Sequence, residues 1–117
     1  MHELALSNGL IEAILGALAE RRITSRVSAV TVEVGRLTSV VPDSLHFYFG
    51  ILRRGTVLED AELQIETIAL RTRCAECSVE SEPETPSLLC SACGGLLTIV
   101  AGREFRLVSI DVAEEAA

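Results

Sequence analysis

The spacing of hydrophobic and polar positions predicts a chain of alternating helices and strands. Residues 3 to about 21 carry leucine and isoleucine at intervals of three and four, which predicts an amphipathic helix. Within residues 25–35 the period changes to two, because Val30, Val32 and Val34 alternate with polar neighbours. That alternation is typical of a strand with one buried face.

A second helix is predicted to begin at Pro42. Proline suits the first turn of a helix, and the carboxylate of Asp43 complements the positive end of the helix dipole. Gly55 is expected to end this helix. Its apolar face is formed by three residues, Leu45, Phe49 and Leu52.

Strand patterns recur in the second half of the chain. Residues 63–67, 96–100 and 103–112 are rich in leucine, isoleucine and valine. Residues 78–89 hold two prolines and several acids, and we expect a loop there with a short strand at its end.

This order of elements predicts an α+β fold. We expect two helices packed on a three-stranded mixed sheet, with a zinc-ribbon-like module of four cysteines inserted between sheet strands. Residues 1–70 plus 103–117 would form the first module, because the last strand returns to it, and residues 71–102 would form the inserted module.

The cysteines form two Cys-x-x-Cys pairs separated by twelve residues: Cys74, Cys77, Cys90 and Cys93. Two such turns facing each other supply four thiolates at tetrahedral corners, which suits a closed structural Zn²⁺ site. The second pair runs into Gly94 and Gly95, where the backbone can take the positive φ that such a turn needs. A redox pair or two disulfides are alternatives, but the pairing is symmetric and we do not expect a secretory signal ahead of the fold.

Composition limits the classes of function. Hydrophobic residues make up 49% of the 117-residue chain, so we expect a folded core, and no apolar run approaches the roughly 20 residues of a membrane span. The net charge of −7 argues against a nucleic-acid partner, which needs a basic face. A cytoplasmic protein with no membrane association is the default expectation.

The first three residues form a potential ligand set. The α-amine of Met1, the amide nitrogen and imidazole of His2, and the amide nitrogen of Glu3 could complete a square plane around Ni²⁺ or Cu²⁺. The alternative interpretation is a polar helix start in which Glu3 complements the helix dipole, and the motif alone favours that alternative.

A series of motifs changes this balance. The following motifs occur in order along the chain: Met-His-Glu-Leu-Ala-Leu at the start, Val-Gly-Arg-Leu-Thr at 34–38, Val-Pro-Asp-Ser-Leu at 41–45, the Gly-Thr turn at 55–56, the two cysteine pairs, and Gly-Arg-Glu-Phe at 102–105. Together they resemble the HypA/HybF family of hydrogenase maturation factors, although Ala5 stands where members often carry a small polar residue. The resemblance implies a nickel metallochaperone with Ni(II) as cargo at Met1, His2 and Glu3, and structural zinc at the four cysteines.

The resemblance also implies partners: a HypB-type GTPase and the [NiFe]-hydrogenase large subunit. A homodimer is an open arrangement, because exchanged strands could pair two chains. The alternative function is a zinc-ribbon module that binds protein or nucleic acid without transferring metal. An enzyme is not expected, because the sequence has no catalytic triad, no paired histidines and no P-loop. His46, the other histidine, is expected at the helix surface.

Overall fold

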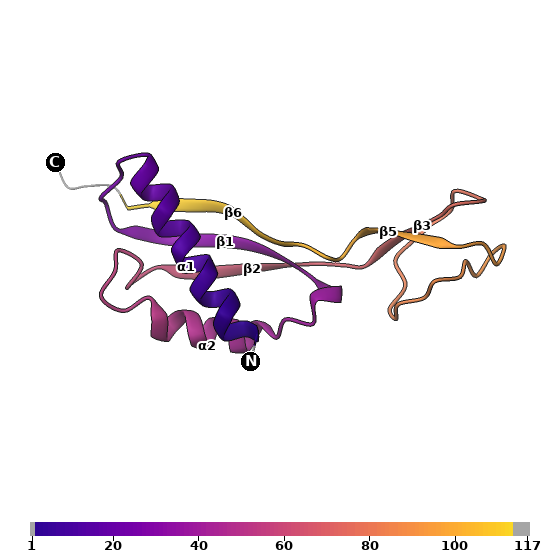
Figure 1. The fold of residues 1–117 in the computed structure, drawn as a ribbon, viewed down its shortest axis with the longest axis horizontal. Helices are drawn as coiled ribbons and strands as arrows, with labels where there is room; N and C mark the ends of the chain where they lie inside the picture. The colour runs from indigo at the N-terminus through magenta and orange to yellow at the C-terminus, as the bar shows by residue number, and fades with distance from the viewer. Residues whose placement is uncertain (1, 114–117) are drawn as a thin grey trace. The chain divides into compact units, whose positions relative to one another are not determined.

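The computed structural model describes residues 2–113, which form two helices, one short 3-10 helix and six strands. In chain order these elements are α1 (His2–Glu20), β1 (Val27–Gly35), η1 (Arg36–Thr38), α2 (Pro42–Leu52), β2 (Glu62–Ile68), β3 (Arg71–Cys74), β4 (Glu80–Ser81), β5 (Leu97–Ala101) and β6 (Phe105–Val112) (Figure 1). None of the described helices combines the length and apolar character that crossing a membrane requires.

The chain folds as two compact units. The first contains the described parts of Met1–Val32, Val40–Glu66 and Leu107–Ala117, and the second contains Glu33–Ser39 and Thr67–Arg106. Each unit has one three-stranded sheet, with the strand order β2-β1-β6 in the first and β4-β3-β5 in the second.

The first unit has the predicted architecture of two helices packed on a mixed sheet. β1 is the central strand, and most of its residues are buried on both faces of the sheet. The Ala113 N–H donates to the Arg26 carbonyl at 2.8 Å, and the Ser28 hydroxyl donates to the Asp111 carbonyl at 3.0 Å. These bonds tie the C-terminal end of β6 to the start of β1.

Helix α1 forms where the apolar periodicity predicts it. The apolar residues that it buries are Leu10, Ile11, Ile14 and Leu18. Burying a side chain such as Ile14 stabilises the fold by about 1.5–3 kcal/mol. The helix ends where Arg22 takes a φ of 56° and the Ile23 N–H donates back to the Leu18 carbonyl at 2.9 Å.

Helix α2 begins at Pro42, as predicted, and buries Leu45 and Phe49. It ends at Leu52 rather than at Gly55, because the next residues form a turn in which the Thr56 N–H donates to the Arg53 carbonyl at 3.2 Å. Gly55 closes that turn with a φ of 76°. The glycine therefore marks the turn that follows the helix.

In the second unit, β3 is the central strand and pairs antiparallel with both neighbours. Thr72 lies opposite Ser81 on β4 and Ile99 on β5. The expected loop over residues 78–89 contains the two-residue strand β4, and its end forms an isolated bridge between Leu89 and Leu96. The sheet holds both cysteine pairs close to its strand ends.

The segment Glu33–Ser39 joins the second unit through a close backbone approach to residues 102–104. The Leu37 N–H donates to the Gly102 carbonyl at 2.8 Å, and the Gly35 N–H donates to the Glu104 carbonyl at 2.6 Å. A Cβ atom on Gly35 would lie 2.1 Å from the Gly102 carbonyl oxygen. Only glycine fits this position.

Replacing Gly35 by alanine should therefore destabilise the protein by at least about 2 kcal/mol, because two backbone segments must separate. Urea unfolding followed by circular dichroism measures this loss. Gly9→Ala is the matched control, since a Cβ atom there meets nothing within 4 Å and alanine favours the helix. Equal stability of the two variants would contradict the close approach.

Candidate metal sites

The four cysteine sulfurs form one compact cluster at the ends of the second sheet. All four Sγ atoms lie within 4.8 Å of one another. Cys74 ends β3, and its Sγ lies 3.4 Å from that of Cys93, while the Cys77 and Cys90 sulfurs are 3.8 Å apart. A tetrahedron with metal–sulfur bonds of about 2.3 Å has edges of about 3.8 Å. The donor set and its size therefore fit one tetrahedral ion.

The two Cys-x-x-Cys turns have matching backbone bonds. The Ser78 N–H donates to the Cys74 carbonyl at 3.0 Å, and the Gly94 N–H donates to the Cys90 carbonyl at 2.9 Å. Ser78 and Gly94 occupy equivalent positions and take φ values of 64° and 77°. Gly94 thus has the positive φ expected from the sequence.

Gly95 is required for a different reason than the sequence suggested. The structure gives no positive φ at this glycine. Instead, a Cβ atom on Gly95 would lie 3.1 Å from the Cys74 Sγ and 2.9 Å from the Glu76 side chain. Because Gly95 has no side chain, the turn that contains Cys74 and Glu76 can approach the turn that contains Cys90 and Cys93.

Backbone amides make one sulfur of each pair the stronger acid. The N–H groups of Cys77 and Glu76 lower the pKa of Cys74 to about 6. The N–H groups of Cys93 and Ala92 likewise lower the pKa of Cys90. In each pair the first cysteine, Cys74 or Cys90, is therefore the one that loses its proton more easily.

The other two sulfurs are held as thiols in the absence of a cation. The Gly95 amide donates to the Cys93 sulfur and so favours its thiolate. The hydrogen bonds that Cys93 shares with the Cys74 and Cys77 sulfurs favour the thiol more strongly, and they raise the pKa of Cys93 to about 12. For Cys77 the Val79 amide also favours the thiolate, yet the Cys74 sulfur and burial raise its pKa. Ionising all four sulfurs together therefore requires a bound cation.

The N-terminal ligand set lies partly within the described chain. The α-amine of Met1 is outside the described residues. His2 opens α1, and its half-exposed imidazole has Nδ1 at 3.7 Å from the Glu3 Oε1. The amide nitrogens of His2 and Glu3 fall in the first helical turn, where no carbonyl of the same helix accepts their N–H groups. The structure thus brings His2 and Glu3 together at a helix end.

The Glu3 carboxylate has a role that sequence reasoning missed. Its Oε2 accepts the Val41 N–H at 3.2 Å, and the side chain is buried. The Val41 amide and the Glu3 amide lower the pKa of Glu3, against the opposing effect of burial. Val41 precedes α2 and has no side-chain cap of its own, so a residue 38 positions away supplies the acceptor.

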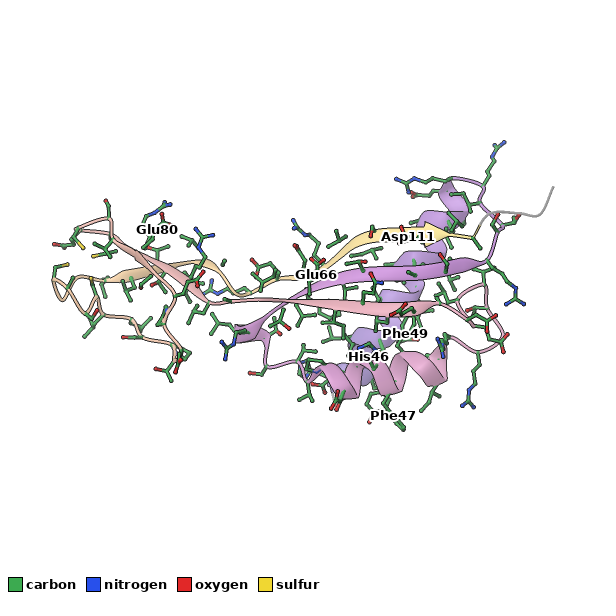
Figure 2. The ribbon with its side chains drawn as sticks, turned by 180° about the vertical axis from the view of Figure 1, so that it is seen from behind. His46, Phe47, Phe49, Glu66, Glu80 and Asp111 are labelled. Carbon is green, nitrogen blue, oxygen red and sulfur yellow. The ribbon has the colours of Figure 1, made fainter. Side chains whose placement is uncertain are left out.

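Other candidate residues lie outside both clusters. His46 and Asp43 are exposed on α2, as expected for surface and helix-start positions. Arg71 and Arg73, on the strand that carries Cys74, both pair with Glu80, at 3.1 and 3.5 Å (Glu80 is labelled in Figure 2). Within residues 2–113 the four cysteines are the group of three or more His, Cys, Asp and Glu side chains that could hold a metal.

Comparison with known proteins covers nearly the whole chain. The hydrogenase maturation factor HypA of Desulfatibacillum aliphaticivorans is 38% identical over 115 residues, covering 97% of this chain and 88% of that protein. The HypA of Streptomyces avermitilis is 39% identical over 112 residues, covering 94% and 86%.

A solved structure shares the fold. The solution structure of a HypA protein superimposes with a TM-score of 0.73 at 24% identity and covers 98% of both chains. The family model described as hydrogenase/urease nickel incorporation, metallochaperone, hypA matches residues 1–112. The chain therefore belongs to the HypA family.

Proposed function

We propose that this protein is a nickel metallochaperone that binds Ni(II) at its N-terminus and delivers it during [NiFe]-hydrogenase maturation. The match to the HypA family over residues 1–112 carries the proposal, because it includes the Met-His-Glu start. In this account the α-amine of Met1, the amide nitrogen and imidazole of His2 and the Glu3 amide nitrogen hold the cargo ion. A HypB-type GTPase and the hydrogenase large subunit are the proposed partners, in the cytoplasm.

The position of His2 and Glu3 supports this ligand set. Amide nitrogens bind nickel only after losing a proton, and an amide that already donates to a helical carbonyl would have to break that bond first. The first-turn amides of α1 have no such carbonyl, although the Glu3 amide donates to its own carboxylate. The positive end of the helix dipole also stabilises the negative charge of a deprotonated amide.

A terminal site also suits transfer of the ion. The buried apolar side chains of α1 begin at Leu10, while Glu3 and Ser7 are buried ahead of them and His2 is exposed. Ligand exchange at His2 therefore leaves the apolar core packed. The Glu3 carboxylate stays bonded to the Val41 amide when only the Glu3 amide serves the metal. The donor nitrogens can then pass to an acceptor one at a time by ligand exchange.

We assign the cysteine cluster to structural zinc. The sulfur spacings fit Zn²⁺, and four protein ligands leave no open coordination position for a substrate. Bound zinc supplies a cross-link among residues 71–102 rather than catalysis. The two ligand sets would select different metals, because thiolates suit zinc and deprotonated amides suit square-planar nickel.

The alternative of a nucleic-acid-binding zinc ribbon has little electrostatic support. Arg71 and Arg73 are paired with Glu80, and Glu76, Glu82 and Glu84 lie exposed in the same module. A polyanion would meet this acidic surface rather than a basic one.

Titration of Ni²⁺ into the zinc-loaded protein at a series of pH values tests the proposed site. Free imidazole has a pKa of about 6.5 and α-amino groups have values of about 7.7–8.0, so protons compete with nickel for both donors. We expect the affinity to fall below about pH 6.5 by at least about tenfold per pH unit. Binding that is insensitive to acid would place nickel elsewhere.

A further inference from the structure

Strand β6 forms one edge of the first sheet. It pairs with β1 on one side, and no other strand of the described chain lies along its second side (Figure 1). Backbone N–H and C=O groups on that second side have no strand to bond with. They can therefore accept a further extended chain by the hydrogen-bond pattern of a β-sheet.

The middle of this edge lacks the features that protect most sheet edges. Charged side chains and proline usually keep an edge strand from pairing with another chain. The opposite edge, β2, follows that rule, because Glu62 and Glu66 are exposed along it. Residues 107–110 of β6, Leu-Val-Ser-Ile, hold neither a charge nor a proline, and Val108 is 48% exposed. Such an edge is typical of a strand that pairs with a partner.

An apolar cavity of about 290 Å³ lies beside the same strand. Helix α1 crosses the sheet, so that its C-terminal end lies next to β6 (Figure 1). Leu18 of α1 and Ile23 after it line the cavity from the helix side, and Leu107 and Ile110 line it from the strand side. This volume is at the lower limit for a ligand pocket, about 300 Å³, so it suits one or two apolar side chains of a peptide better than a cofactor.

A cation stands at this cavity. Arg21 lines it, and Arg22, which follows, is also exposed. Neither arginine forms an ion pair with a described residue, and this includes the neighbouring acids Glu20 and Asp111. The Arg21 guanidinium donates to the Ala17 carbonyl at the long distance of 3.5 Å. A guanidinium without an acidic partner, in a chain of net charge −7, favours a ligand that brings a carboxylate.

We propose that β6 binds an extended segment of another protein as an added strand, with an apolar side chain of that segment in the cavity and a carboxylate beside Arg21. Side chains two positions apart lie on the same face of a strand, so the segment reads apolar, any residue, acidic. Its backbone supplies the hydrogen bonds, while the cavity and Arg21 select the sequence.

The β6 site is separate from the proposed nickel ligands. Arg21 follows the C-terminal end of α1, whereas His2 begins the helix, about 28 Å away at about 1.5 Å per residue. A partner bound at β6 therefore leaves the N-terminal donors open. Binding at β6 requires no nickel.

A synthetic peptide added to the zinc-loaded, ¹⁵N-labelled protein tests this site. The peptide alternates valine with threonine, carries one glutamate two positions after its central valine, and is blocked at both ends. We expect amide chemical shifts to change over residues 17–23 and 106–112, and hydrogen exchange to slow over 107–110. The same peptide with N-methylated backbone amides should not bind, because it cannot donate hydrogen bonds to a strand edge.

Two variants change the charge of the site at exposed positions. Val108→Glu places a charge on the strand edge and should abolish binding. Arg21→Glu should weaken binding at least about fivefold and should prefer a peptide in which lysine replaces the glutamate. The matched controls are Val100→Glu on β5, an edge strand of the other sheet, and Arg54→Glu in the turn after α2. Both positions are exposed and neither lines the cavity, so both controls should bind the peptide like the native protein.

An absence of shifts up to the solubility limit of the peptide, equal binding of the N-methylated peptide, or equal binding by Arg21→Glu would overturn the added-strand site. A chain that lacks residues 114–117 identifies another occupant of the edge. If the peptide binds only to this shortened chain, the edge belongs to the C-terminal residues. If the β6 resonances instead change with protein concentration alone, the edge belongs to a second copy. Either result would also overturn the proposal.

Discussion

Removal of the metal from the cysteine cluster should unfold residues 71–102 while α1 and the sheet of the first unit stay folded. Within 71–102, all of which the structure describes, the buried side chains are Thr72, Cys74 and Cys90. Three of the four leucines of this segment are exposed, with Leu88 at 70%, Leu89 at 59% and Leu96 at 66%, and Leu97 is partly buried. The segment therefore has almost no apolar core to hold it without a metal.

The size of the metal contribution supports this expectation. Binding of structural zinc by small cysteine modules is worth about 10–16 kcal/mol at neutral pH, and whole domains are stable by only about 5–15 kcal/mol. Without the cation, the raised pKa values of Cys77 and Cys93 leave neutral thiols that do not cross-link the two turns.

Hydrogen exchange measured by mass spectrometry, before and after a chelator, reports each region separately. Protection should be lost over 71–102 and kept over Leu10–Leu18 of α1. Cys77→Ser should reproduce the loss, and Ser91→Ala, in the other cysteine turn, is the control that should not. Unchanged protection over 71–102 in the metal-free protein would show that the cluster is not the structural centre of this segment.

Blocking the α-amine should abolish tight nickel binding even though His2 is intact. Acetylation removes the amine as a donor and opens the first chelate ring, and the remaining imidazole and amides cannot complete the square plane. The loss should amount to orders of magnitude in affinity, without a change in fold.

Calorimetric titration of the acetylated protein against the unmodified one measures this loss. A chain with one extra residue before Met1 should fail in the same way, because it displaces the amine from the chelate ring. The same extension at the C-terminus is the control and should bind nickel normally. Full binding by the N-terminally extended chain would exclude Met1 as a ligand.

Local pattern was enough to predict the two helices and the strands β1, β2, β5 and β6, but not β3 or β4. The period of Leu10, Ile14 and Leu18 predicted α1, and Pro42 predicted the start of α2 to the residue. The cysteine spacing predicted one four-sulfur cluster, which the Sγ positions confirm. These signals are local, because each depends on residues within a few turns of one another.

Contacts between distant segments could not be predicted from the pattern. The hydrogen bond between the Val41 N–H and the Glu3 carboxylate depends on how α1 packs against α2. The sequence of neither segment predicts this contact. The need for glycine at Gly35 comes from the Gly102 carbonyl, 67 positions later. The sequence held one indication of the role of Glu3. Helix α2 begins after Val41, whose side chain cannot cap a helix, so the backbone N–H groups at this helix start need an acceptor from another segment.

The roles proposed for the two metal sites are consistent with the geometry of their candidate ligands. The sulfur cluster is closed and held by two backbone turns, which suits a permanent ion. The proposed nickel ligands belong to the first turn of a helix and the chain end, where exchange disturbs little of the core.

Calorimetric titration of Ni²⁺ into zinc-loaded protein with a free Met1, alongside His2→Ala and His46→Ala, tests the central claim most directly. His46 is the other histidine of the chain and is exposed on α2, so it controls for nonspecific binding by imidazole. The account predicts stoichiometric binding by the native protein and by His46→Ala, and loss of tight binding in His2→Ala. Equal binding by all three proteins, or by none, would contradict an N-terminal nickel site.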